Sequence, residues 1–460
     1  MKNQRLRICF EFCVEHFALN ILVFLLRASV VKPSDASAEF SYSVSAIVTR
    51  RTPLPCPARE MAATTKPILA VTMGDPAGIG PEVIVRAWAD PQVHEHVRPL
   101  VVGHPDVMLR AVKLVAGDIA LVPLSSPDQW NESIGGPCSM PIINVCDDAA
   151  ADVPGGVVDA RAGEAAYQCV TAAVRWALEK KIDGIVTAPL SKAALHAAGH
   201  HYPGHTELLA EMCGVRDFAM MLYLPGNNLC ATARSEGGIA ERESGTACLP
   251  APRDDSQASS AESGHGADWS VASSGTQSPV RSPFGLGVAH VTLHQSLRSV
   301  FADLTPAAIV SKCRLADGVM RRLGVSQPRI AVCALNPHAG EDGLFGDEER
   351  TIIAPAVDEA RRSGLSVSGP YPTDTLMLRA RDGEFDAVVA MYHDQGHIAL
   401  KLLGMHAAVN ITLGLPIVRT SVAHGTAFDR AWQGTARAEG MVAAILTAAK
   451  LPQADHGQRR

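Results

Sequence analysis

Residues 68–89, ILAVTMGDPAGIGPEVIVRAWA, join an apolar run to a glycine-containing turn and then to an apolar helical stretch. Gly74, Gly78 and Gly80 permit close approach of the backbone, and Pro81 suits the first turn of a helix. Their spacing differs from the GxGxxG dinucleotide fingerprint. The segment therefore predicts a strand, a tight turn and a helix. The free amides of the turn favour an anionic or carbonyl group of a ligand, and a purely structural turn is the alternative.

The same alternation of short apolar runs and helical stretches continues along the chain. Strands are expected at 68–73, 100–103, 184–187, 218–224, 287–293, 329–335 and 385–391, and helices at 80–89, 106–115, 161–181, 306–323 and 348–363. Short strands separated by amphipathic helices predict a mainly parallel α/β architecture with ligand sites at the carboxyl ends of strands.

Two segments depart from this pattern. Residues 1–60 hold an apolar run too short to span a membrane, and we expect a disordered or spurious N-terminal extension. Residues 228–283 are rich in Ser, Gly, Ala and Asp, which predicts a disordered insertion in a turn between neighbouring strands. The rest predicts a cofactor-side domain of residues 61–190 and 370–450, and a substrate and dimerisation domain of residues 191–369.

Composition excludes several classes of protein. The 460 residues are 47% hydrophobic and 19% charged with a formal net charge of −6, so fibrous and fully disordered chains are excluded. No basic excess indicates a nucleic-acid surface, and no membrane association is expected. Eleven cysteines without a paired CxxC spacing indicate reduced thiols and predict a cytoplasmic protein. Partners are therefore expected to be small molecules or copies of the same chain.

Three histidines follow predicted strands within a few residues, namely His294, His338 and His393. Three neutral imidazoles make a suitable ligand set for a divalent metal ion, although each alone is more often structural. His290 lies inside a predicted strand, so a core position is expected for it. For His397 we expect a solvent-exposed or supporting role.

Several polar residues suit a phosphorylated, carboxylated ligand. His205 and Thr206 suit hydrogen bonding to phosphate, although Thr206 also suits a helix cap. Lys401, Asn410 and Arg419 recur at nine-residue spacing in an otherwise apolar stretch, where they need polar partners. Internal salt bridges are the alternative.

Two carboxylates and one further loop complete the candidate site. Asp374 and Asp394 lie in predicted site loops and suit either orienting an imidazole or moving a proton. The segment 423–429, AHGTAFD, offers a carboxylate that suits a ribose or adenine group.

Five motifs in order along residues 66–448 resemble the signatures of the 4-hydroxythreonine-4-phosphate dehydrogenases. They are GDPAGIGPE at 74–82, GHTE at 204–207, LNPHAGE at 335–341, MYHDQG at 391–396 and VNITLGLP at 409–416. Residues 396–401, GHIALK, and 426–432, TAFDRAW, look more like a sister branch that acts on D-threonate or D-erythronate 4-phosphate. The insertion is foreign to both branches.

The resemblance implies a two-domain fold similar to isocitrate and isopropylmalate dehydrogenases, with NAD as cofactor and one Zn²⁺, Mg²⁺, Mn²⁺ or Co²⁺ ion per subunit. It also implies a homodimer with the active site at the subunit interface. The implied metal ligands are His294, His338 and His393, the substrate-binding residues are His205, Thr206, Lys401, Asn410 and Arg419, and the cofactor-binding residues, carried over more loosely, are Gly78, Gly80, His424, Gly425, Thr426 and Asp429.

The implied reaction is an NAD- and metal-dependent oxidation and decarboxylation of a 4-phosphorylated four-carbon hydroxy acid. In pyridoxal phosphate biosynthesis it would convert 4-phosphohydroxy-L-threonine to 3-amino-2-oxopropyl phosphate; D-threonate or D-erythronate 4-phosphate is the alternative substrate. The base is expected to be Asp374, Asp394 or a water on the metal. A non-catalytic phosphate-ligand binding protein is the alternative from another class.

Overall fold

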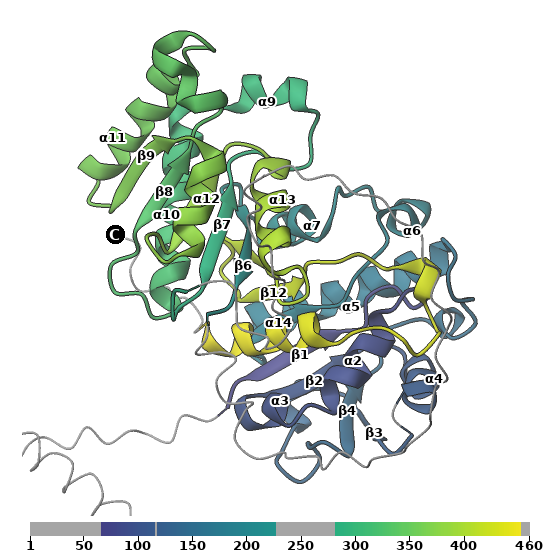
Figure 1. Cartoon of the computed structure of the whole chain (residues 1–460). Coiled ribbons are helices and arrows are strands. Elements are labelled where there is room, and N and C mark those ends of the chain that lie inside the picture. The colour runs from purple at the N-terminus through teal and green to yellow at the C-terminus, as the bar shows by residue number, and fades with distance from the viewer. Residues whose placement is uncertain (1–65, 116, 227–280, 452–460) are drawn as a thin grey trace, which may run out of the picture. The chain divides into compact units, whose positions relative to one another are not determined.

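Within the part of the chain that the structure describes, twelve strands form one sheet (Figure 1). The computed structural model describes residues 66–115, 117–226 and 281–451. All of them lie in one of the two units of the chain, Thr64–Arg460. In sheet order the strands are β3 (Ala120–Leu124), β4 (Ser139–Ile143), β2 (Arg98–Val102), β1 (Ile68–Thr72), β5 (Gly184–Thr187), β12 (Arg419–Val422), β11 (Val409–Leu413), β6 (Ala219–Leu224), β7 (Leu286–His290), β10 (Ala387–Ala390), β8 (Ile330–Cys333) and β9 (Val367–Tyr371).

The sheet consists of two parallel blocks joined by antiparallel strands. The first block runs from β3 to β12, and the second from β7 to β9. Between them, β11 is antiparallel to β12 and β6, and β6 is antiparallel to β7. The predicted mainly parallel α/β architecture is therefore confirmed. Ligand sites in such sheets lie where the strand order changes, which here is the middle of the sheet.

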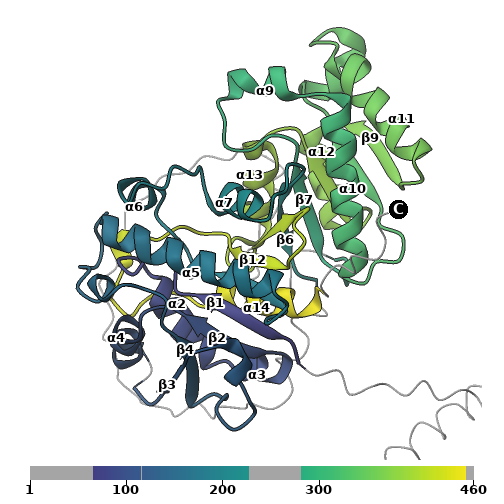
Figure 2. The ribbon, with the colours of Figure 1, turned by 180° about the vertical axis from the view of Figure 1, so that it is seen from behind.

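Helices cover both faces of the sheet, as two opposite views show (Figures 1 and 2). Over the first block α2 lies on one face and α5 on the other, and over the second block α12 and α13 lie opposite α10. The helices are α2 (Gly80–Trp88), α3 (Pro91–His96), α4 (Pro105–Val115), α5 (Ala160–Leu178), α6 (Lys192–Ala197), α7 (His205–Met212), α9 (Leu297–Asp303), α10 (Pro306–Arg322), α11 (Ala354–Arg362), α12 (Thr373–Arg381), α13 (His393–Gly404) and α14 (Glu439–Lys450). Among the described residues no helix is long and apolar enough to cross a membrane.

The turn between β1 and α2 shows why the glycines of this segment are needed. Gly74 has φ +72°, and a Cβ atom there would lie 2.4 Å from the carbonyl oxygen of Pro189. A Cβ atom at Gly80 would lie 2.5 Å from the carbonyl oxygen of Met73. The helix begins at Gly80, and its first turn contains Pro81 and the buried Glu82, whose Oε2 accepts from the N–H of Gly434 at 2.8 Å. The predicted strand, turn and helix are confirmed.

The two irregular segments lie almost wholly outside the described residues, and the predicted domain division is not decided by the structure. Residues 1–60, and the predicted insertion 228–283 apart from its last three residues, lie outside the described residues. The strands that flank the insertion, β6 and β7, are antiparallel neighbours as expected. The predicted boundary at residue 370 falls within β9, and β10 pairs with β7 and β8 rather than with the first block. The domain division itself stays a prediction.

Candidate functional site

Four neighbouring strands in the middle of the sheet make the floor of a polar cavity. The register pairs Thr187 of β5 with Ser421 of β12, Ser421 with Asn410 of β11, and Asn410 with Leu222 of β6. All four residues line a cavity of about 270 Å³. Arg419, the first residue of β12, also lines it. Strand pairing therefore collects polar side chains from distant parts of the sequence into one surface.

The walls of this cavity come from helix starts and loops on both blocks. The first turn of α7 contributes His205 and Thr206, the chain after β7 contributes His294, and the first turns of α13 contribute His393 and His397. The remaining lining residues are Ala188, Pro189, Leu190, Lys192, Gly204, Met220, Val422, Ala423, His424 and Gly425.

The lining residues carry positive charge and no acidic side chain. They include Lys192, Arg419 and five histidines, and none is Asp or Glu. Such a cavity favours anionic ligands, because its cationic lining exceeds the negative charge of the nearby Glu207.

Arg419 is a buried guanidinium without an acidic partner. Its side chain is 1% exposed, and its terminal nitrogens donate to the hydroxyls of Thr412 at 2.9 Å and Thr187 at 2.7 Å. Nε has no hydrogen-bond partner, and no described carboxylate lies within ion-pair distance of the group. Burial lowers the pKa of Arg419 to about 9, so the group remains charged at neutral pH. A buried charge of this kind calls for an anionic ligand.

The N-terminus of α7 adds further hydrogen-bonding groups. Gly204 precedes the helix, no side chain caps it, and Thr206 is its second residue, so the predicted cap at Thr206 is wrong. The N–H groups of the first turn lack helical partners and point beyond the helix end. Burial, followed by the charge of Arg419, lowers the pKa of His205 well below its usual value, and its Nε2 is buried without a partner. Asn410 Oδ1 is also buried without a partner.

Two of the three predicted metal-ligating histidines lie together in this cavity. The ring centroids of His294 and His393 are 5.8 Å apart. His294 Nδ1 lies 3.0 Å from Glu207 Oε1, and His393 Nδ1 lies 2.7 Å from Asp394 Oδ1. A carboxylate accepts hydrogen bonds, so each Nδ1 is the donor and each Nε2 keeps a free electron pair. This is the arrangement of metal-ligating histidines held by carboxylates.

His338 lies elsewhere but has the same arrangement. It is exposed, it does not line the cavity, and its Nδ1 lies 3.0 Å from Glu341 Oε2. Within one chain, the described residues contain no group of three or more His, Cys, Asp or Glu side chains placed to hold a metal ion. The cavity of one chain thus brings together two of the three predicted metal ligands, and His338 of the same chain is not among its lining residues.

The two predicted cofactor segments lie side by side. The N–H of Ile79 donates to the carbonyl oxygen of Thr426 at 3.0 Å, and a Cβ atom at Gly78 would lie 3.0 Å from the Cβ atom of Thr426. His424 and Gly425 continue this segment into the cavity, whereas Asp429 is exposed beyond it. The geometry is compatible with one cofactor that contacts both segments.

Two other predicted residues do not line the cavity. Asp374 is exposed on α12, where its Oδ1 accepts from the N–H of Thr375 at 2.8 Å. Lys401 is half-buried on α13. Burial lowers the pKa of His397 and of His424, and the positive charge of Lys401 lowers both further. Their roles in binding or catalysis stay predictions.

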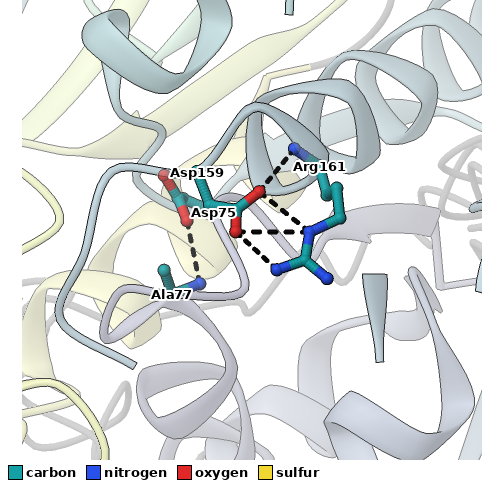
Figure 3. Close-up of polar contacts among 4 residues, drawn as sticks. All are labelled: Asp75, Ala77, Asp159 and Arg161. Atoms are coloured by element: carbon teal, nitrogen blue, oxygen red, sulfur yellow. Dashed lines mark hydrogen bonds and ion pairs between the residues drawn. The ribbon is translucent and has the colours of Figure 1, made fainter. Parts of the chain in front are cut away.

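Asp75, in the turn before α2, is a buried carboxyl group (Figure 3). Its Oδ1 accepts from the N–H of Ala77 at 2.8 Å, whereas Oδ2 is buried without a partner. Burial raises the pKa of Asp75 to about 6, and the nearby carboxylate of Asp159 contributes to this rise. Figure 3 shows Asp159 beside it, held by Arg161.

This raised pKa predicts a specific dependence of stability on pH. From about pH 4 to about pH 6 the unfolded chain releases the Asp75 proton while the folded chain keeps it, so the free energy of unfolding falls as the pH rises. We expect Asp75→Asn to remove this loss, which amounts to up to about 3 kcal/mol. Urea unfolding of both proteins at pH 4 and pH 7 measures the difference, with the exposed Asp118→Asn as control. Parallel stability curves for Asp75→Asn and the parent would contradict the prediction.

The comparisons with known proteins agree with this geometry. The family model described as "Pyridoxal phosphate biosynthetic protein PdxA" matches residues 95–233 and 275–448. The chain belongs to this family. The resemblance to the 4-hydroxythreonine-4-phosphate dehydrogenases is thereby confirmed, and members of this family are oxidoreductases.

Family relatives with two different names are similar to the chain over almost their whole length. D-threonate 4-phosphate dehydrogenase of Pectobacterium atrosepticum is 39% identical over 84% of this chain and 99% of the relative. 4-hydroxythreonine-4-phosphate dehydrogenase of Geobacter metallireducens is 40% identical over 84% of this chain and 96% of the relative. A crystal structure of 4-hydroxythreonine-4-phosphate dehydrogenase from Klebsiella pneumoniae is 38% identical, with a TM-score of 0.64, over 84% of this chain and 99% of that one.

Three residues of this family site were not assigned from the sequence. Lys192 lines the cavity at the start of α6, and Glu207 holds His294 from α7. Burial raises the pKa of Glu207, but the hydrogen bond from His294 and the charge of Lys192 hold it below its usual value. His397 follows His393 by four residues, a spacing that places both on one helix face and could have indicated it.

Proposed function

We propose that this chain catalyses the NAD-dependent oxidation and decarboxylation of a 4-phosphorylated four-carbon hydroxy acid in the cavity described above. The observation that carries the proposal is the buried Arg419 guanidinium, which faces an acid-free cavity beside His294 and His393. The names of the similar dehydrogenases support the same reaction class.

The phosphate of the substrate is assigned to the end of the cavity with unpartnered groups. His205, Thr206, Asn410 and Arg419 meet there, with the free N–H groups of α7. Lys192 lines the cavity and supplies positive charge, and Lys401 adds positive charge from α13 without lining the cavity. Fixing the phosphate there holds the hydroxyl-bearing carbon beside the imidazoles of His294 and His393, which lowers the entropic cost of the reaction.

The divalent metal ion is assigned to His294 and His393 through their free Nε2 atoms. When bound, such an ion lowers the pKa of the substrate hydroxyl and polarises the carbonyl group of the product. Glu207 and Asp394 hold the two rings in the orientation that this requires. In this assignment Asp394 is a positioning residue for His393.

The third ligand is assigned to His338 of a second copy of the chain. Four residues of its loop other than glycine have left-handed backbone conformations, namely His338, Ala339, Glu341 and Asp342. Such conformations are unfavourable and recur at functional sites, so their concentration around an exposed histidine supports a role for this loop.

A homodimer that shares the site would also cover an exposed apolar surface. Ile398 and Leu402 of α13, and Met405 directly after it, are 58%, 83% and 51% exposed and recur at helical spacing. The same helix carries His393 and lines the cavity. An exposed apolar stripe next to an incomplete metal site supports a dimer interface at this position.

The cofactor is assigned to the two segments that lie side by side. Gly78 and Gly80 lie at the start of α2, where they leave room for Thr426 and for the carbonyl oxygen of Met73, and His424, Gly425 and Thr426 lead from there into the cavity. Asp429, exposed beyond them, is assigned to a ribose hydroxyl. This arrangement places the nicotinamide at the cavity and the rest of NAD outside it.

A spectrophotometric assay of NADH formation tests the proposal. Purified protein with added divalent metal is expected to form NADH with at least one of 4-phosphohydroxy-L-threonine, D-threonate 4-phosphate and D-erythronate 4-phosphate. Replacing His393 with alanine should abolish both metal binding and NADH formation. Thermal stabilisation by these phosphates, without any response to NAD and without NADH, would contradict the proposal and favour the non-catalytic binding protein.

A further inference from the structure

Lys192 is a cationic residue of the cavity wall to which the proposed function assigns no chemical step. It is the first residue of α6, where Ser191 caps the helix and its Oγ accepts from the N–H of Ala194 at 3.2 Å. Lys192 lines the cavity, is exposed, and has no hydrogen-bond or ion-pair partner among the described residues. Its ammonium group is therefore free to contact a ligand and to exchange protons with water.

Lys192 lies close to His294 and to the carboxylate that holds this histidine. A Cβ atom at Gly204 would lie 3.4 Å from Glu207 Oε2, 3.7 Å from Lys192 Cε and 3.9 Å from His294 Cε1. The three side chains therefore surround one point of the wall. Because Gly204 itself lines the cavity, this point lies where the substrate is proposed to bind.

The charge of Glu207 favours a position of the Lys192 ammonium group at this wall. Glu207 Oε1 accepts from His294 Nδ1, whereas Oε2 is buried without a partner. Burial raises the pKa of Glu207, but the hydrogen bond from His294 and the positive charge of Lys192 hold it below its usual value. Attraction between these opposite charges directs the ammonium group toward the cavity.

The other titratable side chains that line the cavity already have a partner or an assignment. They are assigned to the metal ion (His294 and His393), the phosphate (His205 and Arg419) and the cofactor (His424). His397 Nδ1 lies 3.1 Å from Nε2 of the buried His290. No carboxylate is among the lining residues. Lys192 is thus the lining residue that has N–H protons to donate and no other assigned partner.

The proposed reaction needs a proton donor at one carbon atom of the substrate. Hydride transfer to NAD converts the hydroxyl group to a carbonyl group, and the hydroxyl proton passes to water. The C–C bond to the carboxylate then breaks, carbon dioxide leaves, and the electron pair of that bond forms an enolate. The carbon that carried the carboxylate must gain a proton to give the ketone product. A donor that recovers its proton from water completes the balance, because one proton is released and one is consumed.

We propose that Lys192 is a further catalytic residue, which donates this proton to the enolate carbon. An N–H bond of the ammonium group breaks as the C–H bond forms, and the resulting amine takes a proton from water. The exposure of Lys192 allows this recovery. The inference rests on the proposed function, because it assigns a residue to one step of that reaction.

Two substitutions at this position separate proton donation from positive charge. Lys192→Arg keeps the charge, but a guanidinium group does not give up its proton in proteins. We expect this variant to keep KM for the phosphorylated acid within about threefold and to lower kcat by about 100-fold or more. Lys192→Ala should lower kcat at least as much, and both variants should fold because the side chain is exposed. A kcat of Lys192→Arg equal to that of the parent would overturn the proposal.

Lys113→Ala is the matched control for these substitutions. Lys113 is exposed on α4 and does not line the cavity, so the variant loses a lysine without losing a group of the site. Its kcat and KM should equal those of the parent.

Added amines test whether an N–H proton is what the alanine variant lacks. Methylammonium should raise kcat of Lys192→Ala by at least about tenfold, in proportion to its concentration, because it carries N–H protons. Tetramethylammonium has the same charge without an N–H bond and should have no such effect. Equal effects of the two cations would overturn the proposal.

The first turnover shows at which step Lys192 acts. Rapid mixing of Lys192→Ala with NAD and the phosphorylated acid should give a burst of NADH close to the concentration of active sites, followed by slow turnover. The reason is that oxidation precedes protonation of the enolate. A slow first turnover without a burst would place Lys192 before hydride transfer and overturn the proposal.

The outcomes distinguish this inference from the proposed function. NADH formation by the parent together with an unchanged kcat of Lys192→Ala would overturn proton donation by Lys192 and leave the proposed function in place. A parent protein that forms no NADH with any of the three phosphorylated acids would overturn the proposed function, and with it the step assigned to Lys192.

Discussion

Replacing Arg419 with methionine is expected to weaken binding of the phosphorylated substrate, and of inorganic phosphate, by about 100-fold or more. The guanidinium is the buried cation of the cavity, and its Nε has no partner among the described residues. Methionine fills a similar volume without charge. Because the substitution removes a buried charge that no acidic residue balances, the free energy of unfolding should not fall by more than about 1 kcal/mol.

Isothermal titration with inorganic phosphate, together with KM for the phosphorylated acid, measures this effect. Arg437→Met is the matched control, since Arg437 is exposed and paired with Glu439 away from the cavity. Phosphate affinity equal to that of the parent protein would show that the phosphate lies elsewhere. Urea unfolding of the variant distinguishes lost binding from lost structure.

The double substitution Ile398→Glu and Leu402→Glu is expected to separate the proposed dimer and to lower kcat by about 1000-fold or more. Both side chains are largely exposed on α13, so the isolated chain tolerates charge there. In the dimer the same positions would place four carboxylates in an apolar interface. Separation would remove His338 of the second copy, and with it the third ligand of the metal ion.

Sedimentation analysis and metal content of the purified variant measure this effect. Leu178→Glu is the control, because Leu178 is exposed at the end of α5, outside the cavity and the stripe. A variant that sediments as a monomer with bound metal and full activity would contradict a shared site. A variant that remains a dimer would place the interface on another surface.

Much of the fold could be predicted because the period of the hydrophobic pattern is local. The apolar runs at 68–73 and 385–391 and the helical stretch at 161–181 correspond to β1, β10 and α5. Strand order and register could not be predicted, since they depend on pairings between residues far apart in the chain. The polar floor of the cavity, where Thr187 pairs with Ser421, is a result of such a pairing.

In the candidate site, too, some features follow from the local sequence, whereas others depend on residues far apart in the chain. His294 and His393 follow β7 and β10, which are parallel neighbours, and their ring centroids lie 5.8 Å apart. His338 follows β8, which also pairs with β10, but its loop of left-handed residues carries it away from the cavity. No local pattern in the sequence indicates that conformation.

The structure explains only part of the nine-residue spacing of the predicted substrate-binding residues Lys401, Asn410 and Arg419. Asn410 and Arg419 lie on β11 and β12, an antiparallel pair whose short connection brings the two residues onto one floor. Lys401 lies on the helix α13 and does not line the cavity. Strand pairing therefore does not explain why it precedes Asn410 by nine residues.

Complementation between two inactive variants tests the central claim most directly. His294→Ala and His338→Ala, each purified alone, are expected to form no NADH, because each lacks one of the three imidazoles in every site. Co-expressed in equal amounts, they should recover about a quarter of the parent activity, since half of the dimers would contain one intact site of two. Full activity of His338→Ala alone, or no recovery in the isolated mixed dimer, would contradict a metal site shared between two copies of this chain.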